Sequence, residues 1–164
     1  MVEDLRITKL REYLMDVINT LAKDKKNRIN ANMLSDDINN YSIDKIPTNP
    51  EIEKWIIGIQ KKKDVYSFRS RMSYSQDTIN NLKNIGFFEE FEKIINSNNK
   101  EGILPDIEGI ESIECLNCGS MNYAGTNTAE FNIQIQITYR ENFKEGEISL
   151  WYLTILRKLK EVNF

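Results

Sequence analysis

The stretch "EFNIQIQITYR", residues 130–140, alternates strictly between apolar and polar side chains. A period of two is that of a β-strand with one face buried and the other outside the core. The apolar face comprises Phe131, Ile133, Ile135, Ile137 and Tyr139. The opposite face comprises Asn132, Gln134, Gln136 and Thr138. This stretch therefore predicts a strand that supplies a large share of the core.

Between Glu130 and Arg140 the polar face of this strand carries no charge. A free protein surface usually mixes charges of both signs, so an uncharged face of amide and hydroxyl groups is unusual. We interpret Asn132, Gln134, Gln136 and Thr138 as candidate contacts to another subunit or protein. A solvated polar face is the alternative.

A second alternating stretch, "VYSFRSRMSY" at residues 65–74, predicts another strand. One face would hold Tyr66, Phe68, Met72 and Tyr74, and the other Ser67, Arg69, Arg71 and Ser73. The preceding "KKKD" at 61–64 has the composition of a polar turn. Lys61, Lys62 and Lys63 would then lie at a hairpin tip, with Arg69 and Arg71 along one face. Such a patch suits a nucleic acid backbone or an acidic protein surface, and a solvated turn is the alternative.

Helical periodicity appears in two regions. Residues 5–23 place Ile7, Leu10, Leu14, Val17, Ile18 and Leu21 on one side of an amphipathic helix. A second helical region starts after Ser75 or Asp77, either of which can cap it, breaks at Gly86, and resumes over 87–97. Short strands are expected at 28–34, 41–46 and 110–116, whereas 53–60 fits a strand or a short helix. Helices and strands in this order indicate an α+β fold.

The last apolar segment, "EISLWYLTILRKLKEV" at 147–162, predicts a docking helix. Its stripe would comprise Leu150, Trp151, Thr154, Ile155, Leu159 and Val162, followed by basic residues near the end. We expect Trp151 and Ile155 to contact a partner. A strand over 148–156 is the alternative.

Composition excludes several classes of function. The 164 residues suit one domain, and the net charge of −3 gives the whole chain no attraction for nucleic acid or anionic lipid. No apolar run approaches the roughly 20 residues that span a bilayer, and the charged N-terminus lacks a signal-peptide core, so we expect a cytoplasmic origin. Histidine is absent, which removes histidine-based acid–base and nucleophilic catalysis and the usual histidine metal ligands.

The remaining candidates for chemistry are two cysteines and an acidic cluster. Cys115 and Cys118 have C-x-x-C spacing. A structural zinc site needs four ligands, and this chain offers one cysteine pair. A redox dithiol needs its first cysteine at the N-terminus of a helix, but Gly119 and Gly125 predict a turn after this pair. We therefore expect two reduced thiols rather than a zinc or redox site. The acidic residues at 89, 90 and 92 suit the first turn of a helix as well as acid–base chemistry. No catalytic residue, metal or cofactor is predicted, and we expect no enzyme.

Four segments occur in an order that resembles a known family: "YSIDKIPTNP" at 41–50, "GFFEEF" at 86–91, "GILP" at 102–105 and "TAEFNI" at 128–133. Over residues 5–140 the chain resembles the tail-terminator or "minor capsid" proteins of Gram-positive phages, defective prophages and phage-tail-like bacteriocins. The two cysteines depart from the plain polar turn of similar proteins. Those proteins often end soon after residue 139, so residues 143–164 form an extension.

The resemblance implies a fold and a function. The fold would be a small α+β domain over residues 1–142, in which a mostly antiparallel sheet packs against helices. The protein would form a ring, usually a hexamer, on the head-proximal end of the tail tube, and would stop polymerisation of the tube and, in contractile tails, of the sheath. Its partners would be copies of itself, the tube protein, and a sheath protein or head–tail connector, with DNA only passing through the ring.

These proteins are made in the bacterial cytoplasm and then become part of the virion or tail-like particle. The resemblance implies no membrane partner. Another head–tail joining protein is an alternative within the same class. A small binding module that uses the patch of Lys61–Lys63, Arg69 and Arg71 is the alternative from a different class.

Overall fold

Two long antiparallel strands form the centre of the sheet in a computed structural model, which describes residues 5–22, 27–55, 58–142, 154 and 157. Strand β4 (Ile59–Ser73) and strand β7 (Thr128–Asn142) pair along their whole lengths. Ile59 lies opposite Asn142 at one end, and Ser73 lies opposite Thr128 at the other. The two stretches with the clearest alternation are therefore the two central strands.

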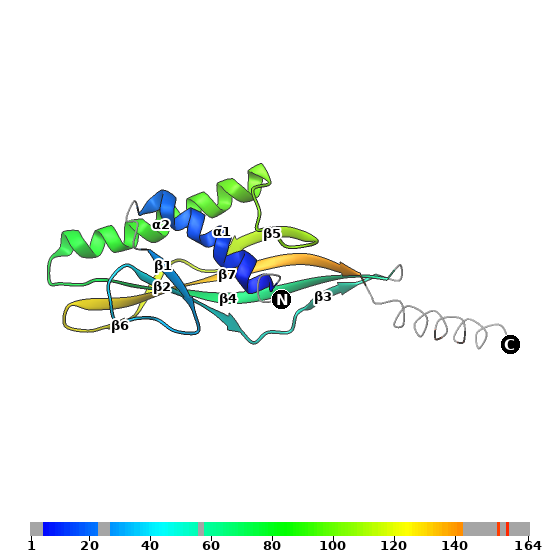
Figure 1. The fold of residues 1–164 in the computed structure, drawn as a ribbon, viewed down its shortest axis with the longest axis horizontal. Helices are drawn as coiled ribbons and strands as arrows, with labels where there is room; N and C mark the ends of the chain where they lie inside the picture. Colours follow the sequence, from blue (N-terminus) through cyan, green and yellow to red (C-terminus); the bar gives the residue numbers. More distant parts are fainter. Residues whose placement is uncertain (1–4, 23–26, 56–57, 143–153, 155–156, 158–164) are drawn as a thin grey trace.

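Shorter strands flank this central pair on both sides (Figure 1). Strands β2 (Asn40–Ile46) and β3 (Glu51–Lys54) pair with β4, while β5 (Ile110–Cys115) and β6 (Ser120–Ala124) pair with β7. Strand β1 (Arg28–Ala31) adds to β2 as the single parallel pair of the described residues. The expected α+β fold with a mostly antiparallel sheet is confirmed.

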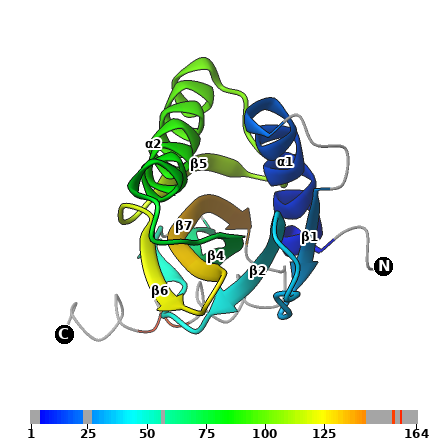
Figure 2. The ribbon, with the colours of Figure 1, turned by 90° about the vertical axis from the view of Figure 1, so that its left-hand side faces the viewer.

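Both helices cover the same face of the sheet, which is curled around them (Figure 2). Helix α1 (Arg6–Leu21) buries the predicted stripe, with Leu10, Leu14 and Ile18 fully inaccessible, and adds Tyr13 to it. Helix α2 (Thr78–Glu101) lies beside α1 and buries Phe88, Phe91 and Ile95. Because the apolar faces of β4 and β7 point to these helices, their polar faces lie on the opposite side of the sheet.

An aromatic stack joins the sheet to α2. The Phe68 ring lies between Tyr41 and Phe91, with centroid distances of 5.6 and 5.1 Å. Phe88 packs against Phe131 at 5.8 Å. The aromatic residues of "GFFEEF" therefore connect the helix to three strands, and aromatic pairs of this kind stabilise a core beyond their buried area.

The ends of α2 follow from local chemistry, whereas its predicted break does not occur. The side chain of Asp77 accepts a hydrogen bond of 3.0 Å from the amide of Ile79, and Gly102 ends the helix with a φ of 74°. The expected break at Gly86 is wrong, because α2 continues through it. A glycine inside a helix costs about 1 kcal/mol relative to alanine, and burial of the phenylalanines that follow offsets this cost.

Two predicted turns are strands. Residues 61–64 lie inside β4 and pair with residues 137–140 of β7, so the lysines occupy no hairpin tip. The turn lies earlier, at Gly58, which has a φ of 86° and donates its amide to the carbonyl of Trp55 over 3.2 Å. Part of the turn expected after Cys118 is strand β6.

The predicted docking helix with Trp151 and Ile155 lies outside the described residues, apart from Thr154 and Arg157. These two residues have helical conformation and are exposed, which favours a helix over a strand at those positions. Neither α1 nor α2 combines the length and the apolar character of a membrane-spanning helix.

Candidate functional site: the polar face and the edges of the sheet

The predicted contact residues of β7 lie together on the side of the sheet that faces away from the helices. Asn132, Gln134 and Gln136 are half-buried, while Thr138 is only 6% exposed. Ser67 of β4 donates a hydrogen bond of 2.8 Å to the side-chain oxygen of Asn132. Part of this face is therefore satisfied within the chain, and Gln134 and Gln136 are the members best placed to meet a partner.

The arginines of β4 are compensated by carboxylates from neighbouring strands. Arg69 donates from Nε to Oδ2 of Asp44 over 2.6 Å and from Nη1 to Oε1 of Glu130 over 3.5 Å. The hydrogen bond to Asp44 stabilises the charged guanidinium and raises the pKa of Arg69. Arg71 places Nη2 3.8 Å from Glu130 and 3.8 Å from Asp36. The two arginines thus contribute to an internal network rather than to a cationic surface.

The lysines of the predicted patch are separated from these arginines along β4. Lys61 lies 3.2 Å from Glu111, and Lys62 forms an ion pair with Glu141. Lys63 donates its amide to the carbonyl of Pro50 over 2.7 Å. Acidic partners therefore accompany Lys61 and Lys62, as they do Arg69 and Arg71, so most of the predicted basic patch is compensated within the chain.

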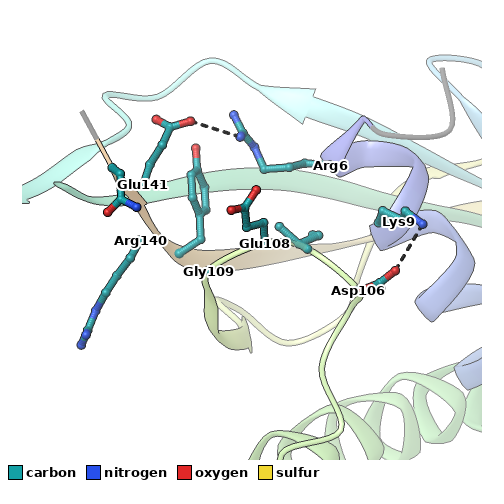
Figure 3. Close-up of a pocket in the computed structure, with 10 residues that line it drawn as sticks. Arg6, Lys9, Asp106, Glu108, Gly109, Arg140 and Glu141 are labelled. Carbon is teal, nitrogen blue, oxygen red and sulfur yellow. Dashed lines mark hydrogen bonds and ion pairs between the residues drawn. The ribbon is translucent and has the colours of Figure 1, made fainter. Parts of the chain in front are cut away.

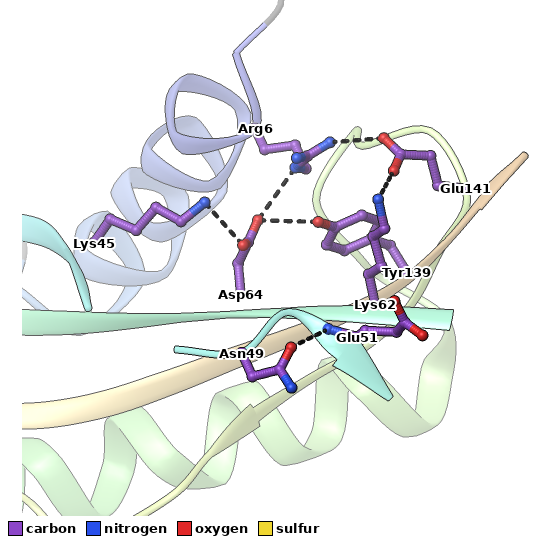
Figure 4. A network of polar contacts seen from close by, with 8 residues as sticks. All are labelled: Arg6, Lys45, Asn49, Glu51, Lys62, Asp64, Tyr139 and Glu141. Carbon is purple, nitrogen blue, oxygen red and sulfur yellow. Dashed lines mark hydrogen bonds and ion pairs between the residues drawn. The ribbon is translucent and has the colours of Figure 1, made fainter. Parts of the chain in front are cut away.

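A buried carboxylate, Asp64, organises a network that sequence reasoning missed (Figure 4). Its side chain is 4% exposed and points to the helix side of the sheet. Lys45 lies 2.8 Å from one carboxylate oxygen, and Arg6 approaches the other to 3.2 Å. The hydroxyl of Tyr139 donates to the same oxygen over 3.3 Å. These contacts fix the start of α1 to β2, β4 and β7.

The network extends to the end of β7. Arg6 lies 3.7 Å from Glu141, and its guanidinium stacks 4.5 Å from the centroid of the Tyr139 ring. Burial raises the pKa of Tyr139 to about 12, while a hydrogen bond from Lys62 lowers the pKa of Glu141. A signal for this network exists in the sequence, because Asp64 occupies the same phase of the strand as the apolar residues that follow it.

A hollow of about 860 Å³ adjoins this network, between α1, the loop before β5 and the end of β7 (Figure 3). Lys9 closes one side through a contact of 3.3 Å to Asp106. Gly109 has a φ of 72° and approaches the backbone of Arg140 so closely that an added Cβ would overlap its carbonyl oxygen. The hollow combines cations with carboxylates, of which Asp106 and Glu141 already form ion pairs.

The edges of the sheet differ in how they are protected. Arg11 donates to the carbonyl of Ile29 in β1 over 2.6 Å, and Asn99 accepts from the amide of Ile113 in β5 over 3.2 Å. Strand β3 follows a proline and carries charged residues. Charges, prolines and covering groups are the usual means by which proteins block pairing at a strand edge. Three of the edges are therefore protected.

Strand β6 has no charge, no proline and no covering hydrogen bond in the part of the chain that the structure describes, and a bulge between Met121 and Tyr123 is the one interruption of its pairing with β7. All five residues of its sequence, "SMNYA", are exposed. Met121 and Tyr123 are 48% and 62% exposed, although both are large and apolar in part. Unprotected edges of this kind add a strand from another chain.

The first half of α2 exposes apolar side chains beside β6. Ile79, Leu82 and Ile85 recur every three residues and are 64%, 59% and 49% exposed. Gly119, which directly precedes β6, approaches the ring of Phe88 in α2 so closely that an added Cβ would overlap it. The start of β6 therefore lies against α2 about one turn beyond Ile85. We name the strand β6 together with Ile79, Leu82 and Ile85 the β6 flank.

The C-x-x-C segment packs α2 against the sheet. Burial raises the pKa of Cys115 to about 12, which is opposite to the lowered pKa of a redox dithiol. Cys118 is an exposed free thiol. A Cβ on Gly119 would overlap the ring of Phe88, so the glycine permits the close approach of strand and helix. The acidic cluster on α2 is at the surface, where Glu90 pairs with the following lysine.

No family model and no curated protein matches the chain. A proposal for its function therefore depends on the surfaces described above and on the segments that resemble tail terminators.

Proposed function

We propose that the protein is a structural component of a phage tail or phage-tail-like particle, and that it forms a ring which ends polymerisation of the tail tube. The β6 flank is the observation that supports this proposal. An unprotected strand edge beside three exposed aliphatic side chains favours association with another chain, because both features are costly on a permanent monomer. No catalytic role is assigned to the protein.

A closed ring needs two different surfaces, since each subunit uses one on one neighbour and the other on the next. Strand β6 pairs with β7 on the same side of that strand as β5, at the edge of the sheet opposite β1. At the other end, the loop between β1 and β2 exposes Met33 (62%) and Ile38 (51%). Two different apolar surfaces at opposite edges of the sheet suit head-to-tail contacts between copies.

The polar face would then meet the other partners. Gln134 and Gln136 offer hydrogen-bonding groups without charge, which suits contact with the last ring of a tube protein. A sheath protein or a head–tail connector would bind elsewhere on the ring. Assembly in the bacterial cytoplasm precedes incorporation into the particle.

The structure bears differently on the two alternative functions, another head–tail joining protein and a nucleic-acid-binding module. Another head–tail joining protein would use the same association surfaces. A nucleic-acid-binding module is disfavoured because Arg69 and Arg71 already pair with carboxylates. Contacts to phosphate groups need cationic side chains that are available to replace the counterions of the nucleic acid.

Negative-stain electron microscopy of the purified protein, alone and with tube protein, tests the proposal. Rings at the ends of tubes are expected for the wild type. Leu82→Asp should abolish the rings without unfolding the chain, because Leu82 is already exposed, and Leu5→Asp is a matched control outside the β6 flank. A wild-type protein that stays monomeric and leaves the tube ends open would contradict the proposal.

A further inference from the structure

A groove of about 360 Å³ lies between α1 and α2, on the side of the helices that faces away from the sheet centre. Its apolar lining comes from Tyr13, Val17, Ile94 and Ile103. Ile103 is 51% exposed, although it is a large aliphatic residue. Asn98 donates a hydrogen bond of 3.0 Å to the hydroxyl of Tyr13, which fixes the floor of the groove. The groove is preformed and has room for one or two large side chains.

The rim of this groove is acidic. Asp16 lines it, and Glu12 lies one helical turn earlier on the exposed side of α1. Neither carboxylate has an ion pair within the described residues. Like charges four residues apart on a helix repel each other, so a cation placed beside them would be stabilising.

Residues 143–164 carry the complementary pattern. As a helix, the segment places Trp151 and Ile155 on its apolar stripe. Lys158 follows Trp151 by seven residues, and therefore points to the same side about 10 Å further along the axis. The two described positions of the segment, Thr154 and Arg157, are helical and exposed. An aromatic anchor followed by a cation fits an apolar groove with an acidic rim.

We propose that residues 143–164 of one copy dock as a helix in the α1–α2 groove of a neighbouring copy, with Trp151 in the groove and Lys158 beside Glu12 and Asp16. This inference rests on the proposed ring, because it needs a second copy close by. Docking of an amphipathic helix in a groove is a common mode of recognition, and a buried tryptophan is a common anchor.

The direction of β7 favours docking between copies over docking within one. The contact between Arg6 and Glu141 places the end of β7 beside the first turn of α1, whereas the groove begins at Tyr13, two turns further on. Figure 1 shows β7 running past α1, so the strand leaves the body of the protein at the end away from the groove. We therefore assign the groove of a neighbouring copy in the proposed ring, rather than the chain's own groove, to residues 143–164.

Crosslinking between differently tagged copies tests the docking. One copy carries Thr20→Cys at the groove and the other carries Thr154→Cys, both in the full chain with Cys118→Ser. A short bismaleimide should join the two tags, whereas copies without the introduced cysteines should give only background. Absence of the mixed product, or a product formed only within a chain that carries both cysteines, would overturn the inference.

Substitutions then test the anchor and the charge pair. Trp151→Ala should weaken assembly at least tenfold in the concentration at half-association, while Leu153→Ala, on the opposite side of the same helix, should change it less than twofold. Asp16→Lys should also weaken assembly, and combining it with Lys158→Glu should restore it. Equal effects of the two alanine variants, or no rescue by the charge exchange, would overturn the proposed contacts.

The outcomes separate this inference from the proposed function. Rings on tube ends without the mixed crosslink leave the tail-terminator function standing and reject the docking. A mixed crosslink in a protein that forms no ring and ignores tubes supports the docking and rejects the terminator function.

Discussion

Replacing Asp64 with asparagine should destabilise the protein by about 2–3 kcal/mol. The carboxylate is 4% exposed and receives contacts from Lys45, Arg6 and Tyr139. The two cations are 54% and 40% exposed, so each pair contributes only about 0.5 kcal/mol after solvent screening. A hydrogen bond from a buried hydroxyl to a charged acceptor adds about 1.5 kcal/mol. These contributions sum to about 2.5 kcal/mol, the middle of the expected range.

Thermal and chemical unfolding of the full chain measures this loss. For a protein of this size, each kcal/mol shifts the midpoint by about 2–4 °C, so Asp64→Asn should lower the Tm by about 5–10 °C. Asp106→Asn is the matched control, because Asp106 also pairs with a lysine but is 93% exposed. The control should change stability by less than about 0.5 kcal/mol.

A double-mutant cycle tests the reasoning behind the number. If Tyr139 acts through Asp64, the combined variant Asp64→Asn with Tyr139→Phe should lose less stability than the sum of the two single variants. A loss below about 1 kcal/mol for Asp64→Asn, or equal effects of Asp64→Asn and Asp106→Asn, would refute the idea that this carboxylate fixes α1 to the sheet.

Three further variants probe packing, thiol chemistry and pH. Gly119→Ala should cost about 1–3 kcal/mol in unfolding free energy, because its Cβ overlaps an aromatic ring, whereas Gly86→Ala should be neutral or stabilising, since nothing lies within 4 Å of the added carbon. Alkylation at pH 8 should modify the exposed Cys118 much faster than Cys115, because burial raises the pKa of Cys115 to about 12 and shields its sulfur; equal rates would contradict this. A hydrogen bond from a lysine lowers the pKa of Glu141, so its stabilising contribution is complete above the ordinary value of 4.5 and is lost as the pH falls through the folded pKa. The stability difference between wild type and Glu141→Gln should therefore shrink in acid, and a constant difference in denaturation midpoints would count against it.

Alternation identified the central strands because it reports burial directly. In residues 130–140 every second side chain is apolar, and a one-residue shift of register would move the whole set out of the core. The same holds for the stripe of α1, where the period of 3.6 places one side of the helix on the sheet. Tyr13 was not included in the predicted stripe, because its polar hydroxyl group gives no indication that the ring is buried.

The wrong predictions share a physical cause, which is that distant residues override local preference. Three successive lysines suit a turn by composition, yet they lie in β4 because Glu111 and Glu141 of other strands compensate two of them. Gly86 is a helix breaker by propensity alone. It stays helical because Phe88 and Phe91, two and five residues later, bury their rings in the core.

The candidate site was predictable in part for the same reason. The polar face of β7 follows from alternation, but the compensation of Arg69 and Arg71 in β4 by Asp44 and Glu130 depends on which strands lie side by side. The β6 flank could not be predicted from the sequence, because it is recognised only by comparison with the other strand edges. Those edges carry protecting groups that β6 lacks.

The central position of β7 has a consequence for how the protein folds. Its partner β4 begins more than 50 residues earlier in the chain, and β5 and β6 also depend on β7 for their place in the sheet. During synthesis the sheet stays incomplete until residue 142 has left the ribosome, and one edge of β4 lacks its pairing strand until then. Pairings of this sequence separation fold slowly, in milliseconds to seconds. A chaperone that binds β4 until β7 has been synthesised should therefore raise the yield of folded protein more than substitutions in the helices do.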